Sequence, residues 1–137
     1  MSGPAMALPP PMRLRGHRCF DLLHRRGKRH DSDHLVLRVV QADPRRLSPP
    51  LQRWENLDPG ARRCRCGVVI SSKVSKRSVK RNRLRRALHQ HLRSRLEGDP
   101  RLADRWLLLS LRPSAADAGP GLLEECDRLL RKAGLLP

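Results

Sequence analysis

A long basic stretch without a single carboxylate is the feature that most limits how this chain can fold. Between Pro59 and Leu96 there are 13 Lys or Arg side chains and no Asp or Glu. The density is highest in residues 73–86, where eight of the fourteen residues are Lys or Arg. Like charges three or four positions apart destabilise a helix, and mixed signs would serve solubility better. We therefore expect this stretch to bind a polyanion that neutralises it.

The positive charge is unevenly distributed. The chain has 30 Lys or Arg and 13 Asp or Glu, a net charge of +17. Residues 1–96 carry 24 basic and 6 acidic side chains, a net +18, whereas residues 97–137 carry 6 and 7, a net −1. Nucleic acid and an anionic membrane both fit this pattern, but the longest apolar run, at 106–111, is far too short to span a bilayer. We expect no membrane association, and a cytoplasmic protein, because residues 1–16 lack the apolar block of a secretory signal.

Apolar periodicity predicts six secondary-structure elements in one domain, residues 13–134. They are helix, strand, strand, helix, strand and helix, at residues 17–26, 34–40, 66–70, 79–96, 106–111 and 122–133. This order indicates an α/β or α+β sandwich, with one small sheet and helices packed over a face. The Pro-rich residues 1–12 are predicted to be flexible. Residues 41–64, with four prolines, are predicted to be a long loop or insertion with a turn of helix near 52–57.

The 79–96 helix is predicted to pack with one face and to bind with the other. Ser75 or Ser78 could cap its start. Its apolar face consists of Leu84, Ala87, Leu88 and Leu92, and its polar face of Asn82, Arg86, His89 and Arg93. Arg81, Asn82 and Arg83 combine guanidinium groups, which can grip phosphate oxygens in pairs, with an amide for a base edge or sugar hydroxyl. Because the chain has one Phe, two Trp and no Tyr, recognition of backbone and shape should dominate over base stacking.

The residues that could support catalysis by the protein itself are scattered. The cysteines at 19, 64, 66 and 126 match neither zinc-site spacing nor a disulfide framework, so reduced structural thiols are expected. Asp31 and Asp33 are better explained as turn formers, and His89 and His91 fall on different helix faces. The acidic residues at 124, 125 and 127 are explained by the dipole of the final helix. We assign no metal site and no catalytic residue to the protein.

Residues 66–86 resemble the ribonuclease P protein family. The resemblance lies in Cys66-Gly-Val-Val-Ile-Ser-Ser-Lys-Val-Ser-Lys and Lys80-Arg-Asn-Arg-Leu-Arg-Arg86, a strand, a Ser/Lys-rich turn and a helix that opens with Arg-Asn-Arg. Residues 13–15, 20–29 and 107–113 also look like segments of this family. The resemblance implies a two-layer α/β sandwich of the ribosomal-protein-S5-domain-2-like kind, with a mixed sheet of about four strands and a left-handed βαβ crossover.

The resemblance also implies an accessory subunit of a ribonucleoprotein endonuclease. In this family a catalytic RNA subunit removes the 5′ leader of precursor tRNA by Mg²⁺-dependent hydrolysis, and Mg²⁺ is bound mainly by that RNA. The protein binds the catalytic RNA and the leader, and we expect no obligate protein partner. By motif position the RNA-binding residues are Ser72, Lys73, Lys76, Lys80, Arg81, Asn82, Arg83, Arg85, Arg86 and His89.

The expected leader cleft departs from the family pattern. The first helix of the family usually offers two aromatic residues one turn apart, where this chain has Phe20 and His24. The facing strand often carries an aromatic residue, where this chain has Arg38. The leader would then be held by charge and hydrogen bonds more than by stacking, and Phe20 fits a core position equally well. The alternative function is a non-enzymatic structural RNA-binding protein of the ribosomal kind.

Overall fold

The structure of the chain, a computed structural model, describes residues 8–58, 60 and 62–137. All six predicted elements are present, with ends within one residue of the prediction. The helices and strands are α1 (His17–Arg26), β1 (Lys28–Asp31), β2 (Leu35–Gln41), α2 (Pro49–Leu57), β3 (Arg65–Val69), α3 (Ser78–Leu96), β4 (Arg105–Leu111) and α4 (Gly121–Lys132). Short 3-10 helices are η2 (Pro10–Met12), η3 (Pro44–Arg46), η5 (Pro100–Leu102) and η6 (Pro113–Asp117).

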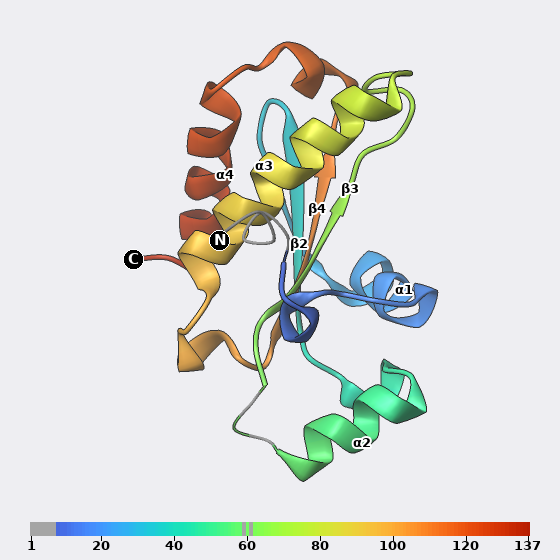
Figure 1. The fold of residues 1–137 in the computed structure, drawn as a ribbon. Coiled ribbons are helices and arrows are strands. Elements are labelled where there is room, and N and C mark those ends of the chain that lie inside the picture. Colours follow the sequence, from blue (N-terminus) through green and yellow to red (C-terminus); the bar gives the residue numbers. More distant parts are fainter. Residues whose placement is uncertain (1–7, 59, 61) are drawn as a thin grey trace, which may run out of the picture.

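The four strands form one mixed sheet in the order β1-β2-β4-β3. β2 is antiparallel to both β1 and β4, whereas β3 is parallel to β4. The chain passes from β3 to β4 through α3; in Figure 1 this helix lies in front of the sheet and β4 lies to the left of β3, so the crossover is left-handed. The separate strand β1 was not predicted, because Lys28–Asp31 has no β-branched residue and becomes a strand by pairing with β2.

Two hydrophobic clusters lie on opposite faces of the sheet. Leu35 and Leu37 of β2 and Leu107 and Leu109 of β4 pack with α3 and α4 on the first face. Because side chains alternate along a strand, Trp106 and Leu108 point the other way, where they pack with Leu22, Leu23 and other residues of α1. The sandwich formed with α3 and α4 is therefore extended by α1, which covers part of the second face.

The segment before α1 is packed against the domain from Leu8 onward, which corrects the prediction that residues 1–12 are flexible. Leu8 and Met12 are buried in the first cluster, and the backbone N–H of Leu14 donates to the carbonyl of Cys66 at 2.9 Å. Residues 13–14 thus run along the outer edge of β3. The prolines that suggested a frayed end instead open a 3-10 turn. Residues 1–7 lie outside the described residues.

The insertion at 41–64 is more structured than predicted, because it contains η3 and the nine-residue helix α2. Pro49 and Pro50 occupy the first turn of α2, where proline is tolerated. Glu55 anchors the helix by an ion pair of 3.1 Å with Arg65, whose side chain is 1% exposed. Arg65 Nη1 also donates to the carbonyl of Arg13 at 2.8 Å. One buried cation therefore joins the insertion, the N-terminal segment and β3.

Two acidic residues of α4 make tertiary contacts that the helix-dipole interpretation did not foresee. Glu125 accepts hydrogen bonds from Ser32 Oγ and, at 2.7 Å, from the backbone N–H of His34. Asp127 accepts from His91 Nε2 at 2.7 Å and from Arg95 Nε at 3.1 Å. Burial alone would raise the pKa of Asp127, but these hydrogen bonds from Arg95 and His91 hold it below its ordinary value. The two carboxylates tie α4 to the β1–β2 turn and to α3.

Candidate nucleic-acid interface

The turn that leads from β3 into α3 presents three of the expected RNA-binding residues. Ile70 and Val74 are buried and hold the turn against the core. Ser71 Oγ accepts from the backbone N–H of Lys73 at 3.2 Å, and Ser75 Oγ accepts from that of Arg77 at 3.2 Å. Ser75 therefore orders the turn before the helix, and α3 itself begins without a side-chain cap. Ser72, Lys73 and Lys76 are all exposed on this turn.

The first two turns of α3 place some of the expected residues in solvent and give others a partner within the protein. Asn82, Arg83 and Arg86 are exposed. Arg81 is half-buried, because its Nη1 donates to the carbonyl of Ser75 at 2.7 Å, and Arg85 Nη1 donates to Asn82 Oδ1 at 3.0 Å. Lys80, Arg85 and His89 are also half-buried. We call Lys73, Lys76, Arg83 and Arg86 the α3 surface, because these cations are exposed together.

The buried face of α3 differs from the predicted one at a single position. Leu88 and Leu92 are buried as expected, Leu84 is half-buried, and Leu96 continues the row. Ala87 is exposed, which corrects its assignment to the apolar face. The helix packs along a narrower stripe than predicted, since residues 88, 92 and 96 follow one another every four positions.

His89 marks the point where α3 approaches the N-terminal segment. Burial lowers the pKa of His89, and the charges of Arg85 and Arg13 lower it further. A neutral imidazole at this position can accept or donate a hydrogen bond but adds no charge.

The three residues of the expected leader cleft lie on or beside the second face of the sheet. A Cβ on Gly67 would lie 3.0 Å from Phe20 Cε1, so the aromatic ring rests directly on the glycine. Gly67, Leu108 and Arg38 are neighbours across β3, β4 and β2, which puts Arg38 about 10 Å from Gly67 along the row. Arg38 is half-buried and touches the end of α1 near Gly27. His24 is exposed, one turn after Phe20.

Beyond α1 this second face is exposed only at its β3 edge. Val36, Ser110 and Val69 are neighbours in the next row across the sheet; Val36 is buried, whereas Val69 is 39% exposed. On the β1 side, Arg29 lies opposite Arg38, an additional cation that the sequence analysis did not assign and that forms an ion pair with Asp31 at 2.7 Å. Since Val69 is followed directly by the turn that carries Ser72 and Lys73, the exposed edge of this face and the α3 surface meet at the carboxyl end of β3. We call Phe20, Arg38, Arg29 and Val69 the α1-side face.

The described residues contain no group of three or more His, Cys, Asp or Glu that could hold a metal ion. All four cysteines are buried and unpaired. The hydrogen bond with Cys64 and complete burial raise the pKa of the Cys66 thiol well above its ordinary value, and burial raises the pKa of Cys126 to about 12. These thiols stay protonated and fill the core. In the part of the chain that the structure describes, no helix is both long and apolar enough to cross a membrane.

The comparisons with known protein families and with curated proteins point to one and the same family. The family model described as ribonuclease P matches residues 8–134. The chain is 62% identical over 131 residues to the ribonuclease P protein component of Parasynechococcus marenigrum, covering 95% of this chain and 98% of that protein. It is 58% identical to the protein of the same description from Prochlorococcus marinus, covering 96% of this chain and 99% of the other.

Solved structures with a similar fold agree with this result. The fold is similar to that of the Staphylococcus aureus RNase P protein, with a TM-score of 0.66 at 14% identity over 92% of this chain and 98% of the other. It is also similar to that of the RNase P protein from Thermotoga maritima, with a TM-score of 0.64 at 19% identity over 88% and 96% of the two chains. At these identities the likeness concerns the fold alone.

Proposed function

Because this chain belongs to the ribonuclease P protein family, we propose that it binds the catalytic RNA of ribonuclease P and the 5′ leader of precursor tRNA. In this proposal the RNA cuts the phosphodiester bond and the protein is an accessory subunit. The α3 surface binds the RNA subunit, and the α1-side face holds the leader.

The concentration of exposed cations on the α3 surface is the observation that supports RNA binding most directly. Lys73, Lys76, Arg83 and Arg86 are exposed on one turn and the helix that follows it, in a stretch whose sequence has no carboxylate. Each phosphate that such a side chain neutralises releases condensed counterions, which strengthens binding at low salt. Asn82 adds a donor and an acceptor for a base edge or a 2′-hydroxyl.

The proposed leader site rests on the α1-side face. Phe20 offers an aromatic edge above Gly67, whereas Arg29 and Arg38 supply charge on the neighbouring strands. With one aromatic residue at this face, a single-stranded leader would be held chiefly through its phosphates, which favours weak sequence preference. Its 5′ end would continue past Val69 toward Lys73, so that both surfaces bind one substrate complex.

In this proposal Mg²⁺ would be bound by the RNA subunit, where it would supply the Lewis-acid chemistry of phosphodiester hydrolysis. The protein's own residues neutralise phosphate repulsion between the RNA subunit and the precursor. Lys73, Lys76, Arg83 and Arg86 would lower the Mg²⁺ concentration that the assembled complex needs, because fixed cations replace part of the diffuse counterion atmosphere. His89, kept neutral, would contribute a hydrogen bond.

Reconstitution tests this function. Adding the protein to a bacterial ribonuclease P RNA at low Mg²⁺ should increase the rate of precursor tRNA cleavage. Arg83→Ala combined with Arg86→Ala should reduce that increase, whereas the matched control Arg101→Ala, an exposed cation paired with Asp99, should retain it. A protein that binds the RNA tightly without any gain in cleavage rate or substrate affinity would be a structural RNA-binding protein, and the proposal would be rejected.

A further inference from the structure

The insertion and the N-terminal segment enclose a groove beside the start of α1. A cavity of about 560 Å³ is lined by Pro10, Arg15, Arg18, Arg46, Ser48 and Leu51, among others. A second cavity of about 410 Å³ is lined by Pro10, Leu51, Trp54 and Arg65. The two cavities are adjacent, because Pro10 and Leu51 line both, and we call them together the insertion groove. Their volumes fall in the range of small-ligand sites.

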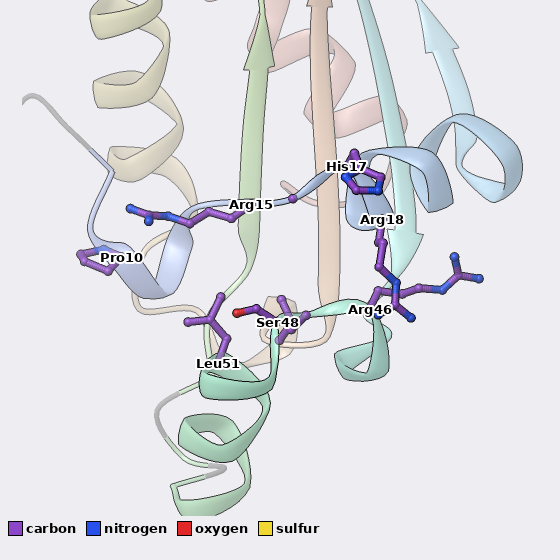
Figure 2. Close-up of a pocket in the computed structure, with 9 residues that line it drawn as sticks. Pro10, Arg15, His17, Arg18, Arg46, Ser48 and Leu51 are labelled. Carbon is purple, nitrogen blue, oxygen red and sulfur yellow. The ribbon is translucent and has the colours of Figure 1, made fainter.

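The rim of the insertion groove is cationic. Figure 2 shows Arg18 reaching down from α1 beside Arg46, with Arg15 extending toward Pro10 on the other side. Within the described residues, Arg15 and Arg18 are exposed and have no ion-pair partner. Arg46 shares Asp43 with Arg45 at a distance of 3.6 Å. No carboxylate is found among the described residues that line the two cavities. Arg18 and Arg46, which lie side by side, can bind one phosphate, whereas Arg15 offers its charge on the other side of the groove.

The walls of the groove are apolar and include the most exposed Trp of the chain. Trp106 is 1% exposed and belongs to the core, whereas Trp54 is 40% exposed. Trp54 borders the second cavity together with Leu51 and Pro10. An exposed indole beside a cationic rim is the arrangement that proteins use to stack an unpaired base while they hold its phosphate. Trp54 is therefore available for base stacking in a chain that has very few aromatic residues.

Positive charge continues from the N-terminal segment to the rim of the insertion groove. Arg13 is half-buried, and its Nε donates to the carbonyl of Leu8 at 2.7 Å. Arg15, two residues further along the chain, lies at the rim of the groove. Leu47 and Leu51, which line the groove, pack in the cluster on the second face of the sheet, so the leader is the competing occupant that the experiment has to distinguish.

We propose that the insertion groove binds one unpaired nucleotide of the ribonuclease P RNA. Its phosphate lies beside Arg18 and Arg46, Arg15 neutralises a neighbouring phosphate of the same strand, and the base stacks on Trp54 and Leu51. This inference rests on the proposed function, because it names the RNA that α3 binds as the occupant. It also gives the 41–64 insertion a role, because η3 positions Arg46 and α2 positions Trp54 at the groove.

Two variants with substitutions at exposed residues test the groove. Trp54→Leu should weaken binding of the RNA subunit about tenfold, since stacking of one base is worth about 1–3 kcal/mol. The matched control is Leu57→Ser, which removes an apolar side chain that is 85% exposed on the same helix. Arg15→Ala with Arg18→Ala should lower the slope of log affinity against log salt concentration by about two. The control is Arg25→Ala, which should leave this slope unchanged, because Arg25 is exposed and already paired with Asp21. Binding should also quench tryptophan fluorescence in the wild type and not in Trp54→Leu, whose remaining Trp106 is buried.

The outcomes distinguish the proposal for the insertion groove from the proposed function of the α3 surface. If the groove variants bind the RNA subunit like the wild type while Arg83→Ala with Arg86→Ala binds weakly, the groove proposal is wrong and the proposed function stands. If the groove variants lose only affinity for precursor tRNA that carries a leader, the occupant is the leader and the groove proposal is overturned. If the free protein self-associates and Trp54→Leu abolishes this in sedimentation, the occupant is a second copy, which also overturns it. If the α3 variant too is indistinguishable from the wild type, both proposals fail.

Discussion

Replacing Glu55 by alanine should destabilise the protein by about 3–5 kcal/mol, because it leaves the charge of Arg65 buried without its partner. The Arg65 side chain is 1% exposed and that of Glu55 is 5% exposed, so the ion pair is formed away from bulk solvent. Two carbonyls, those of Pro10 and Arg13, would still accept from Arg65 Nη1, which favours the lower half of the range. For a chain of 137 residues, this loss corresponds to a fall in Tm of roughly 10–17 °C.

Thermal unfolding followed by circular dichroism, in a buffer of fixed sulfate concentration, measures this effect. Glu55→Gln should lose less, because an amide oxygen can still accept from Arg65. Asp21→Ala is the control: it breaks an exposed ion pair with Arg25 and should cost less than about 1 kcal/mol. Amide exchange should show α2 losing protection in Glu55→Ala ahead of the sheet. Equal stability of Glu55→Ala and Asp21→Ala would show that the ion pair is not buried in solution.

Three further predictions concern the RNA, the leader and acid stability. Arg83→Ala with Arg86→Ala should lower the slope of log affinity against log salt for ribonuclease P RNA by about two, measured by filter binding across a salt series; an unchanged slope would place the RNA elsewhere. Gly67→Ala should displace the Phe20 ring at a cost of about 1–3 kcal/mol and should weaken binding of leader-bearing precursor more than binding of mature tRNA; equal losses would remove the leader from this face. The depressed pKa of Asp127 contributes stability above the ordinary carboxyl value of 3.8, and this is lost as the pH falls through the lower folded value. Denaturant titrations below pH 3.8 should therefore show a steeper loss for the wild type than for Asp127→Asn, and parallel curves would contradict the proposed hydrogen bonds.

The elements that were predicted correctly are those marked by a local apolar pattern. In α4 the pattern is a helical period, and the stripe through Leu122, Cys126, Leu129 and Leu130 is buried as a whole. In β4 the pattern is a short apolar run that ends before a proline, and Trp106, Leu107, Leu108 and Leu109 are buried on both faces of the sheet. Such patterns reflect local geometry, so a single sequence reveals them. β1 escaped prediction because its strand conformation depends on a neighbour in the sheet and not on its own residues.

The roles of individual charges could not be predicted, because they depend on tertiary contacts. Arg65 belongs to the basic stretch in the sequence, yet it is buried against Glu55, whereas Arg83 a few residues later is exposed. Arg81, which is predicted to bind RNA, also donates from Nη1 to the carbonyl of Ser75, a contact that the sequence does not reveal. Charge density indicates how many cations a surface can offer, and only packing decides which of them are free. The insertion groove was missed for the same reason, since its residues come from three separated segments.

The two edges of the sheet, at β3 and at β1, determine whether two molecules can associate by strand pairing. Beyond β3, residues 13–14 occupy the backbone groups that another chain could otherwise use. Beyond β2, the terminal strand β1 is four residues long and begins with Lys28 and Arg29, and short charged edge strands discourage pairing between molecules. Removal of residues 8–14 would uncover the carbonyl of Cys66 and the neighbouring backbone at the outer edge of β3. We therefore expect a protein without this segment to pair strand to strand more readily than the whole chain before it meets RNA.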